Sequence, residues 1–184
     1  MMNKFYNLAI VCGRFQPLHD GHVEIIEKAL SIADKVGLYI GSANNTGTAN
    51  NPFTYEERYK FIQAVFAEEI ENGSLLIKPL NDREHPADDL SWGKYYLECI
   101  HKDFGKPDVF VYGNDKVRSQ WFTEDDLKGI DTLIVNRKTN NISATQLRAH
   151  IHEVAFFTYN TPAELWPYYE MIRNKINEVN KNGK

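Results

Sequence analysis

The sequence predicts an α/β fold with a doubly wound, mainly parallel five-stranded sheet and helices on both faces. Short apolar runs typical of buried strands alternate with segments whose apolar residues recur at helical spacing. This alternation implies parallel strands joined by right-handed helical crossovers. The chain of 184 residues is long enough for one domain, which would bury about 70% of the surface that the unfolded chain exposes.

The elements follow one another in a regular order. Five apolar runs are expected to form the strands, at residues 8–12, 36–41, 75–80, 109–112 and 132–135. Helical spacing predicts helices between them, at about residues 22–33, 55–69, 92–104 and 116–122. Three capping-box pairs mark helix starts: Thr54 with Glu57, Ser143 with Gln146, and Thr161 with Glu164.

The C-terminal region carries a separate helical pattern. Apolar residues at helical spacing over residues 161–180 predict an amphipathic helix, with Pro162 at its first position. We expect residues 1–150 to form the α/β domain and residues 151–184 a helical extension packed on the same domain. The apolar face of that helix also suits a subunit interface, and we expect a homo-oligomer.

Composition excludes several classes of protein. The formal net charge is −4, and no block of five like charges occurs, which disfavours non-specific nucleic-acid binding. No apolar run approaches the roughly 18 residues of a membrane span, and the N-terminus is too polar for a signal peptide. Cys12 and Cys99 lack CxxC or metal spacing and indicate a reducing compartment. We therefore expect a cytoplasmic protein with no nucleic-acid or membrane partner.

Two long loops follow strands of the predicted sheet. Residues 43–53 are rich in Asn, Gly and Thr, and residues 81–91 carry several charged side chains. Open α/β sheets bind ligands beyond the carboxyl ends of their strands, and loops of this length are usually functional. We expect the 81–91 loop to be mobile without ligand.

Three segments carry candidate chemistry. GRFQPLHDGH at residues 13–22 places His19 and His22 at a strand-to-helix junction, where free N–H groups and the helix dipole attract anions. NPFTYEER at 51–58 and NISATQLR at 141–148 are turns that enter helices and end on arginines. Taken singly, each has a purely structural alternative: a βα turn with exposed histidines, a solvated Arg58, and simple helix starts at Ser143 and Thr145.

Taken together and in this order, the segments resemble one family. HxGH after the first strand and ISxTx[ILV]R near the end are typical of the nucleotidyltransferase superfamily. GRFQPxHxGH, GSA at 41–43 and NPFTxxER resemble the archaeal-type nicotinamide-nucleotide adenylyltransferases and their bacterial relatives with a fused Nudix domain. The resemblance runs from about residue 7 to residue 150. It implies a Rossmann-like nucleotidyltransferase domain over residues 1–150, and no Nudix-sized segment follows, so we expect no fused hydrolase.

The resemblance implies adenylyl transfer from ATP to nicotinamide mononucleotide (NMN), giving NAD and pyrophosphate by direct attack of the NMN phosphate. It implies that His19 and His22 contact the ATP phosphates and that Arg14, Thr145 and Arg148 hold the β- and γ-phosphates. Arg58 would grip the NMN phosphate, and Trp92 would stack on the nicotinamide ring. Further ATP-binding positions are Gly13, Phe15, Gly21, Asn114 and Ser143. Mg²⁺ would be held mainly by phosphate oxygens and water, with no dedicated protein ligands.

Several positions keep an alternative. Asp89 stands where the family has Asn, and a carboxylate can accept from the amide NH₂ of the carboxamide but cannot donate to its oxygen. Trp92 could equally be a core aromatic. Asn114 could simply cap the following helix, and Ala144 replaces the usual Gly. Two other functions stay open: adenylyl transfer to another phosphorylated acceptor (nicotinic acid mononucleotide or phosphopantetheine), and a non-catalytic module that senses ATP or NAD.

Overall fold

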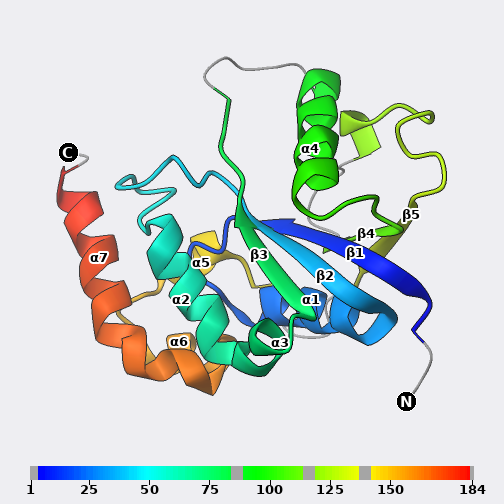
Figure 1. The fold of residues 1–184 in the computed structure, drawn as a ribbon. Helices are drawn as coiled ribbons and strands as arrows, with labels where there is room; N and C mark the ends of the chain where they lie inside the picture. Colours follow the sequence, from blue (N-terminus) through cyan, green and yellow to red (C-terminus); the bar gives the residue numbers. More distant parts are fainter. Residues whose placement is uncertain (1–3, 84–88, 114–118, 137–141, 183–184) are drawn as a thin grey trace.

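A computed structural model of the chain describes residues 4–83, 89–113, 119–136 and 142–182. Its sheet has five parallel strands in the order β3-β2-β1-β4-β5 (Figure 1). The strands are β1 (Tyr6–Gly13), β2 (Ala33–Ile40), β3 (Leu75–Pro79), β4 (Val109–Gly113) and β5 (Asp131–Val135). The chain runs outward from β1 to β3 and then returns to the other side of β1. The predicted doubly wound sheet is therefore confirmed, with its switch point between β1 and β4.

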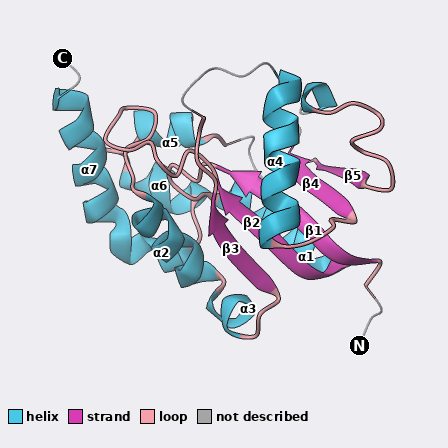
Figure 2. Cartoon of the chain, turned by 45° about the horizontal axis from the view of Figure 1, so that its top comes forward, coloured by secondary structure: helices cyan, strands magenta, loops and turns pink. Residues whose placement is uncertain are grey.

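Helices cover both faces of this sheet. In Figure 2, α4 (Asp89–Asp103) crosses in front of the sheet and α1 (Asp20–Ile32) lies behind it. The remaining helices are α2 (Tyr55–Val65), α3 (Ala67–Glu71), α5 (Ala144–Ala149), α6 (Val154–Asn160) and α7 (Tyr169–Asn182), with 3₁₀ helices η1 (Ser119–Trp121) and η2 (Ala163–Tyr168). None of the described helices is long and apolar enough to cross a membrane.

The central strand is buried on both faces and so contributes to two cores. Ala9 and Val11 belong to the core beneath α1, whereas Leu8 and Ile10 belong to the core beneath α4. Successive side chains of a strand point to opposite faces, which explains this alternation and the continuous apolar run in the sequence. The second core is rich in aromatic side chains from α4, from β4 and from residues 121–122 at η1.

Several predicted boundaries were wrong. Strand β2 begins at Ala33, directly after α1, and not at residue 36. The sequence did not indicate this early start, because polar Asp34 and Lys35 are exposed there and gave no apolar signal. The helix expected over residues 55–69 is two helices, because the backbone leaves helical geometry at the buried Phe66 (φ −118°, ψ 36°). The helix expected over residues 116–122 is, in its described part, the 3₁₀ helix Ser119–Trp121.

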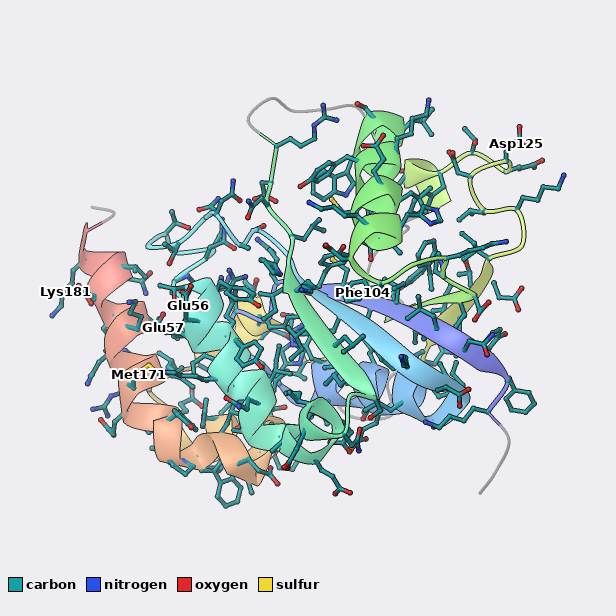
Figure 3. The ribbon with its side chains drawn as sticks, in the orientation of Figure 1. Glu56, Glu57, Phe104, Asp125, Met171 and Lys181 are labelled. Carbon is teal, nitrogen blue, oxygen red and sulfur yellow. The ribbon has the colours of Figure 1, made fainter. Side chains whose placement is uncertain are left out.

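The C-terminal region packs on the α1 side of the sheet. The helix expected over residues 161–180 begins as the 3₁₀ helix η2, which contains Pro167, and becomes α-helical at Tyr169. Pro167 lies inside η2 and has no N–H to donate, so it cannot make the hydrogen bond that an α-helix would require at that position. Leu165, Ile172 and Ile176 are buried in the same core as α1. Glu57 lies between α2 and α7 in Figure 3, and its Oε1 accepts a hydrogen bond from Lys175 Nζ at 3.2 Å.

Candidate active site

One cavity of about 460 Å³ opens beyond the carboxyl ends of the parallel strands, at the switch point between β1 and β4. Its walls come from both layers of helices. Polar side chains come from the β1–α1 turn and α5, and large aromatic ones from α4, β4 and η1. Of the residues predicted for the site, it brings together Gly13, Arg14, Phe15, His19, His22, Trp92, Ser143, Thr145 and Arg148.

The β1–α1 turn holds the two histidines against each other. His19 is the N-cap of α1, and its carbonyl accepts hydrogen bonds from the backbone N–H groups of His22 (2.8 Å) and Val23 (3.1 Å). The two imidazole rings are stacked, with centroids 3.7 Å apart and planes 22° apart. Both rings therefore face the cavity as one unit at the start of a helix, where the dipole favours anions.

Phe15 supports this pair from the side. Its ring meets His22 edge-on, with centroids 4.8 Å apart, and it is 1% exposed. The backbone at Phe15 has φ 51°, in the left-handed region that few side-chain-bearing residues adopt. A Cβ on Gly13 would lie 2.9 Å from the Phe15 ring. Glycine at position 13 therefore allows Phe15 to fold back over β1 and reach His22.

Helix α5 is tied to the same turn by Arg148. Its Nη1 donates to the Gln16 carbonyl at 2.7 Å, and its Nη2 donates to Thr145 Oγ1 at 3.3 Å. Ser143 caps the helix through a capping box with Gln146, as predicted. Burial lowers the pKa of Arg148, and the positive charge of Arg14 lowers it further. An anion bound beside the guanidinium groups of Arg14 and Arg148 would reduce the electrostatic repulsion between them.

Arg58 does not line the cavity. It is fully buried and donates to four carbonyls: Thr54 (3.1 Å), Arg14 (2.9 Å), Gly41 (2.7 Å) and Ser42 (3.2 Å). Burial lowers its pKa to about 10, so the guanidinium remains charged at neutral pH. The expectation that Arg58 grips an acceptor phosphate does not fit this geometry, because its side chain does not line the cavity and backbone carbonyls accept from four of its five N–H donors.

Gln16 fastens the neighbouring loop. Its side-chain amide donates to the Phe53 carbonyl at 3.1 Å and accepts from the Phe53 N–H at 2.9 Å, and Gln16 is 1% exposed. Gln16 is part of the motif at residues 13–22, but the sequence analysis predicted no role for it. Its position among the apolar residues Phe15, Pro17 and Leu18 was the available signal, because a buried amide must find partners.

The opposite side of the cavity is aromatic. Trp92, in the first turn of α4, meets Trp121 of η1 with ring centroids 6.2 Å apart and planes 79° apart. Both line the cavity together with Tyr112. Asp82 also lines it and accepts a hydrogen bond from Ser42 Oγ at 3.1 Å. Sequence reasoning assigned no role to Trp121, Tyr112 or Asp82.

Some predicted positions fall elsewhere. Gly21 is buried in the first turn of α1 and does not line the cavity. Asn114 lies outside the described residues, as does the middle of the 81–91 loop at residues 84–88; Asp89 begins α4, but its side chain is not described. Within the described part of the chain, no group of three or more His, Cys, Asp or Glu side chains could hold a metal ion.

Comparisons with known proteins identify relatives in one family. Residues 10–150 match the cytidylyltransferase-like family model. A nicotinamide-nucleotide adenylyltransferase of Thermococcus kodakarensis is 34% identical over 143 residues, covering 77% of this chain and 70% of the relative. Another, of Thermoplasma volcanium, is 30% identical over 165 residues, covering 90% and 85%.

A solved structure shares the fold. It is a bifunctional NMN adenylyltransferase/ADP ribose pyrophosphatase of Francisella tularensis, complexed with AMP and a manganese ion. It matches with a TM-score of 0.73 at 22% identity, covering 97% of this chain and 53% of that chain. The chain thus spans about half the length of that solved protein.

Proposed function

The chain belongs to the cytidylyltransferase-like family, among the nicotinamide-nucleotide adenylyltransferases, and from this membership we propose that it transfers the adenylyl group of ATP to NMN. The products would be NAD and pyrophosphate. One observation carries the proposal: the His19–His22 pair, Arg14, Arg148 and an aromatic wall line a single cavity at the switch point of the sheet. A polyphosphate and a planar ring can both be accommodated by such a combination.

The acceptor needs no catalytic base. The second pKa of a phosphate monoester lies near 6, so NMN arrives mostly as a dianion. One of its phosphate oxygens attacks the α-phosphorus of ATP, a new P–O bond forms, and the bond to the bridging oxygen breaks as pyrophosphate leaves. The protein then has two tasks: to align the reactants and to stabilise negative charge on the departing pyrophosphate.

We assign those tasks to the polar side of the cavity. His19 and His22 would contact the ATP phosphates and stabilise the charge that develops there. Arg14, Thr145 and Arg148 would hold the β- and γ-phosphates. The geometry of Arg148 supports this assignment, because hydrogen bonds to the Gln16 carbonyl and the Thr145 hydroxyl already orient its guanidinium. A group oriented before the substrate binds loses little freedom on binding.

A divalent cation fits this scheme, and we propose Mg²⁺. The described residues offer no three-ligand protein cluster, which suits a cation that keeps its water and binds mainly to substrate phosphates. When bound, it would neutralise part of the triphosphate charge.

For Arg58 we propose a positioning role. Its hydrogen bonds to Arg14, Gly41 and Ser42 connect the end of β1, the end of β2 and helix α2. These segments form one rim of the cavity, with Gly41 and Ser42 among its lining residues. Arg58 would thus shape the substrate site from behind rather than contact the acceptor phosphate.

We also propose that residues 151–184 form a helical extension of one folding unit, because Leu165, Ile172 and Ile176 share the core beneath α1. We further propose that the enzyme is a homo-oligomer and that it is located in the cytoplasm. Light scattering tests the first property, and fractionation of cells tests the second.

The decisive experiment is an acceptor series. Purified protein is given ATP and Mg²⁺ with NMN, nicotinic acid mononucleotide or phosphopantetheine, and pyrophosphate release is followed with His22→Ala as the control. We expect the highest kcat/KM with NMN. Faster turnover of phosphopantetheine would refute the acceptor assignment, and ATP binding without turnover of any acceptor would favour a sensing module.

A further inference from the structure

One carboxylate lies in a cavity whose other charged side chains are basic. Among the described residues that line the cavity, Asp82 is the only acidic one, beside Arg14, Arg148 and the two histidines. Its exposed side chain follows β3, at the carboxyl edge of the sheet. A carboxylate repels phosphate groups, so Asp82 does not serve the triphosphate. Because an ionised carboxylate only accepts hydrogen bonds, its partner on a substrate must be a donor.

Two side chains from the end of β2 hold Asp82 in place. The side-chain amide of Asn44 donates to the Asp82 carbonyl at 3.0 Å and accepts from the Asp82 N–H at 2.8 Å, which fixes the backbone. Ser42 Oγ donates to Asp82 Oδ1 at 3.1 Å, which fixes the side chain. Ser42 has φ 48°, in the left-handed region, and its carbonyl accepts from Arg58 Nη2 at 3.2 Å. The carboxylate is therefore oriented before a substrate binds, and its two oxygens can accept further hydrogen bonds.

The place of Asp82 along the cavity wall corresponds to the middle of a nucleotide. Strands β1, β2 and β3 are successive neighbours in the sheet (Figure 1), and Arg14, Ser42 and Asp82 follow them in that order. Trp92 lies in the next helix. Burial lowers the pKa of Arg58, the charge of Asp82 raises it and that of Arg14 lowers it, so both charged groups lie near one guanidinium. Between a phosphate held at Arg14 and a ring against the aromatic side, this part of the wall faces the sugar.

We infer that Asp82 is a specificity-determining residue that accepts hydrogen bonds from the 2′- and 3′-hydroxyls of the NMN ribose, and that Asn44 and Ser42 are its positioning residues. The two hydroxyls of a ribose are donors side by side, which the two oxygens of a carboxylate match. Hydrogen bonds to a charged group are about twice as strong as those between neutral groups. The inference rests on the proposed function and deepens it, because it specifies the sugar as a recognised part of the substrate. A phosphorylated substrate without a ribose, such as phosphopantetheine, gains nothing from Asp82.

The test uses the full chain with Asp82→Ala, Asp82→Asn and Asn44→Ala, and compares NMN with its 2′,3′-dideoxy analogue. The two compounds share the ring and the phosphate, so the ratio of their kcat/KM values isolates the hydroxyl contacts. Asn45→Ala is a matched control, because Asn45 is an exposed asparagine beside Asn44 that does not line the cavity. Thermal unfolding shows that each variant is folded. We expect Asp82→Ala to reduce the preference for NMN over the analogue about tenfold and to leave the KM for ATP within about twofold.

Asp82→Asn should keep part of the preference, because an amide still bonds to hydroxyls but without the charge. Asn44→Ala should fall between wild type and Asp82→Ala, and a wild-type preference there would overturn the positioning role. An unchanged preference in folded Asp82→Ala would overturn the inference. Equal losses with NMN and the analogue would also overturn it, because Asp82 would then act on the ring or the phosphate. If Asp82→Ala does not fold, Asp82→Asn decides by the same criteria.

The failure of the proposed function would look different. Wild-type protein that turns over neither compound would refute adenylyl transfer to NMN and leave the binding question open to calorimetry. Tighter binding of NMN than of the dideoxy analogue, with a difference that Asp82→Asn reduces, would then support the inference about Asp82. Equal binding of the two compounds to wild-type protein would overturn it.

Discussion

Replacing Arg58 by methionine should destabilise the protein and impair both substrates together. Methionine keeps an apolar stem of similar length but removes every donor of the guanidinium. Three carbonyls on other segments, at Arg14, Gly41 and Ser42, would then lose partners that lie 2.7–3.2 Å away. These groups lie around a fully buried side chain, so water is poorly placed to replace the lost bonds.

The expected size of the effect follows from these contacts. A hydrogen bond from a charged donor contributes roughly 1.5 kcal/mol at the low end of its range, so three of them suggest a loss of about 4–5 kcal/mol. A stable domain has only about 5–15 kcal/mol in total. For a chain of this size each kcal/mol shifts the Tm by about 2–4 °C, so a fall in Tm of roughly 10–15 °C is expected.

Thermal unfolding and steady-state kinetics together decide the matter. Arg173→Met is the matched control, since Arg173 is a half-buried arginine on α7 whose ion pair with the exposed Glu170 should contribute under about 1 kcal/mol. Arg58→Lys should recover only part of the loss, because one ammonium group cannot bridge carbonyls on two segments as the planar guanidinium does. A Tm within 2 °C of wild type together with a selective rise in the KM for NMN would refute the bracing role and restore Arg58 as the phosphate ligand.

Three further predictions follow from the site. His22→Ala should lower kcat by a factor on the order of 10²–10³ while the calorimetric Kd for ATP changes much less; a kcat within twofold of wild type would remove His22 from the mechanism. Gln16→Ala should lower the free energy of unfolding by about 2–3 kcal/mol in urea titrations, because both polar groups of Phe53 lose a buried partner; a loss under about 0.5 kcal/mol would contradict this role. EDTA should abolish turnover, because the proposed Mg²⁺ would be held mainly by the ATP phosphates and water, and the Tm of the nucleotide-free protein should then stay unchanged; a fall in Tm would indicate a structural metal.

Features specified by neighbouring residues could be predicted from the sequence. The strand–turn–helix over residues 8–33 was predicted because a continuous apolar run, a glycine-containing turn and helical spacing follow one another along the chain. Of the three predicted capping boxes, those at Thr54 and Ser143 form. The one at Thr161 does not, because the Thr161 hydroxyl donates to the Phe157 carbonyl of α6 instead. His19, His22 and Trp92 line one cavity because parallel strands bring their carboxyl ends to the same edge.

Features that depend on contacts between distant segments required the tertiary structure. Arg58 sits in a motif that suggested a phosphate ligand, yet its partners are backbone carbonyls from two other turns. Every residue has a carbonyl, so such acceptors leave no trace in the sequence. The packing of Gly93 against the Trp121 backbone, where a Cβ would collide with the carbonyl oxygen, is likewise invisible along the chain, because each position alone is an ordinary helix or turn residue. The sequence by itself predicted which turns carry the candidate anion-binding side chains; packing decided which arginines line the cavity and which aromatic side chains form its wall.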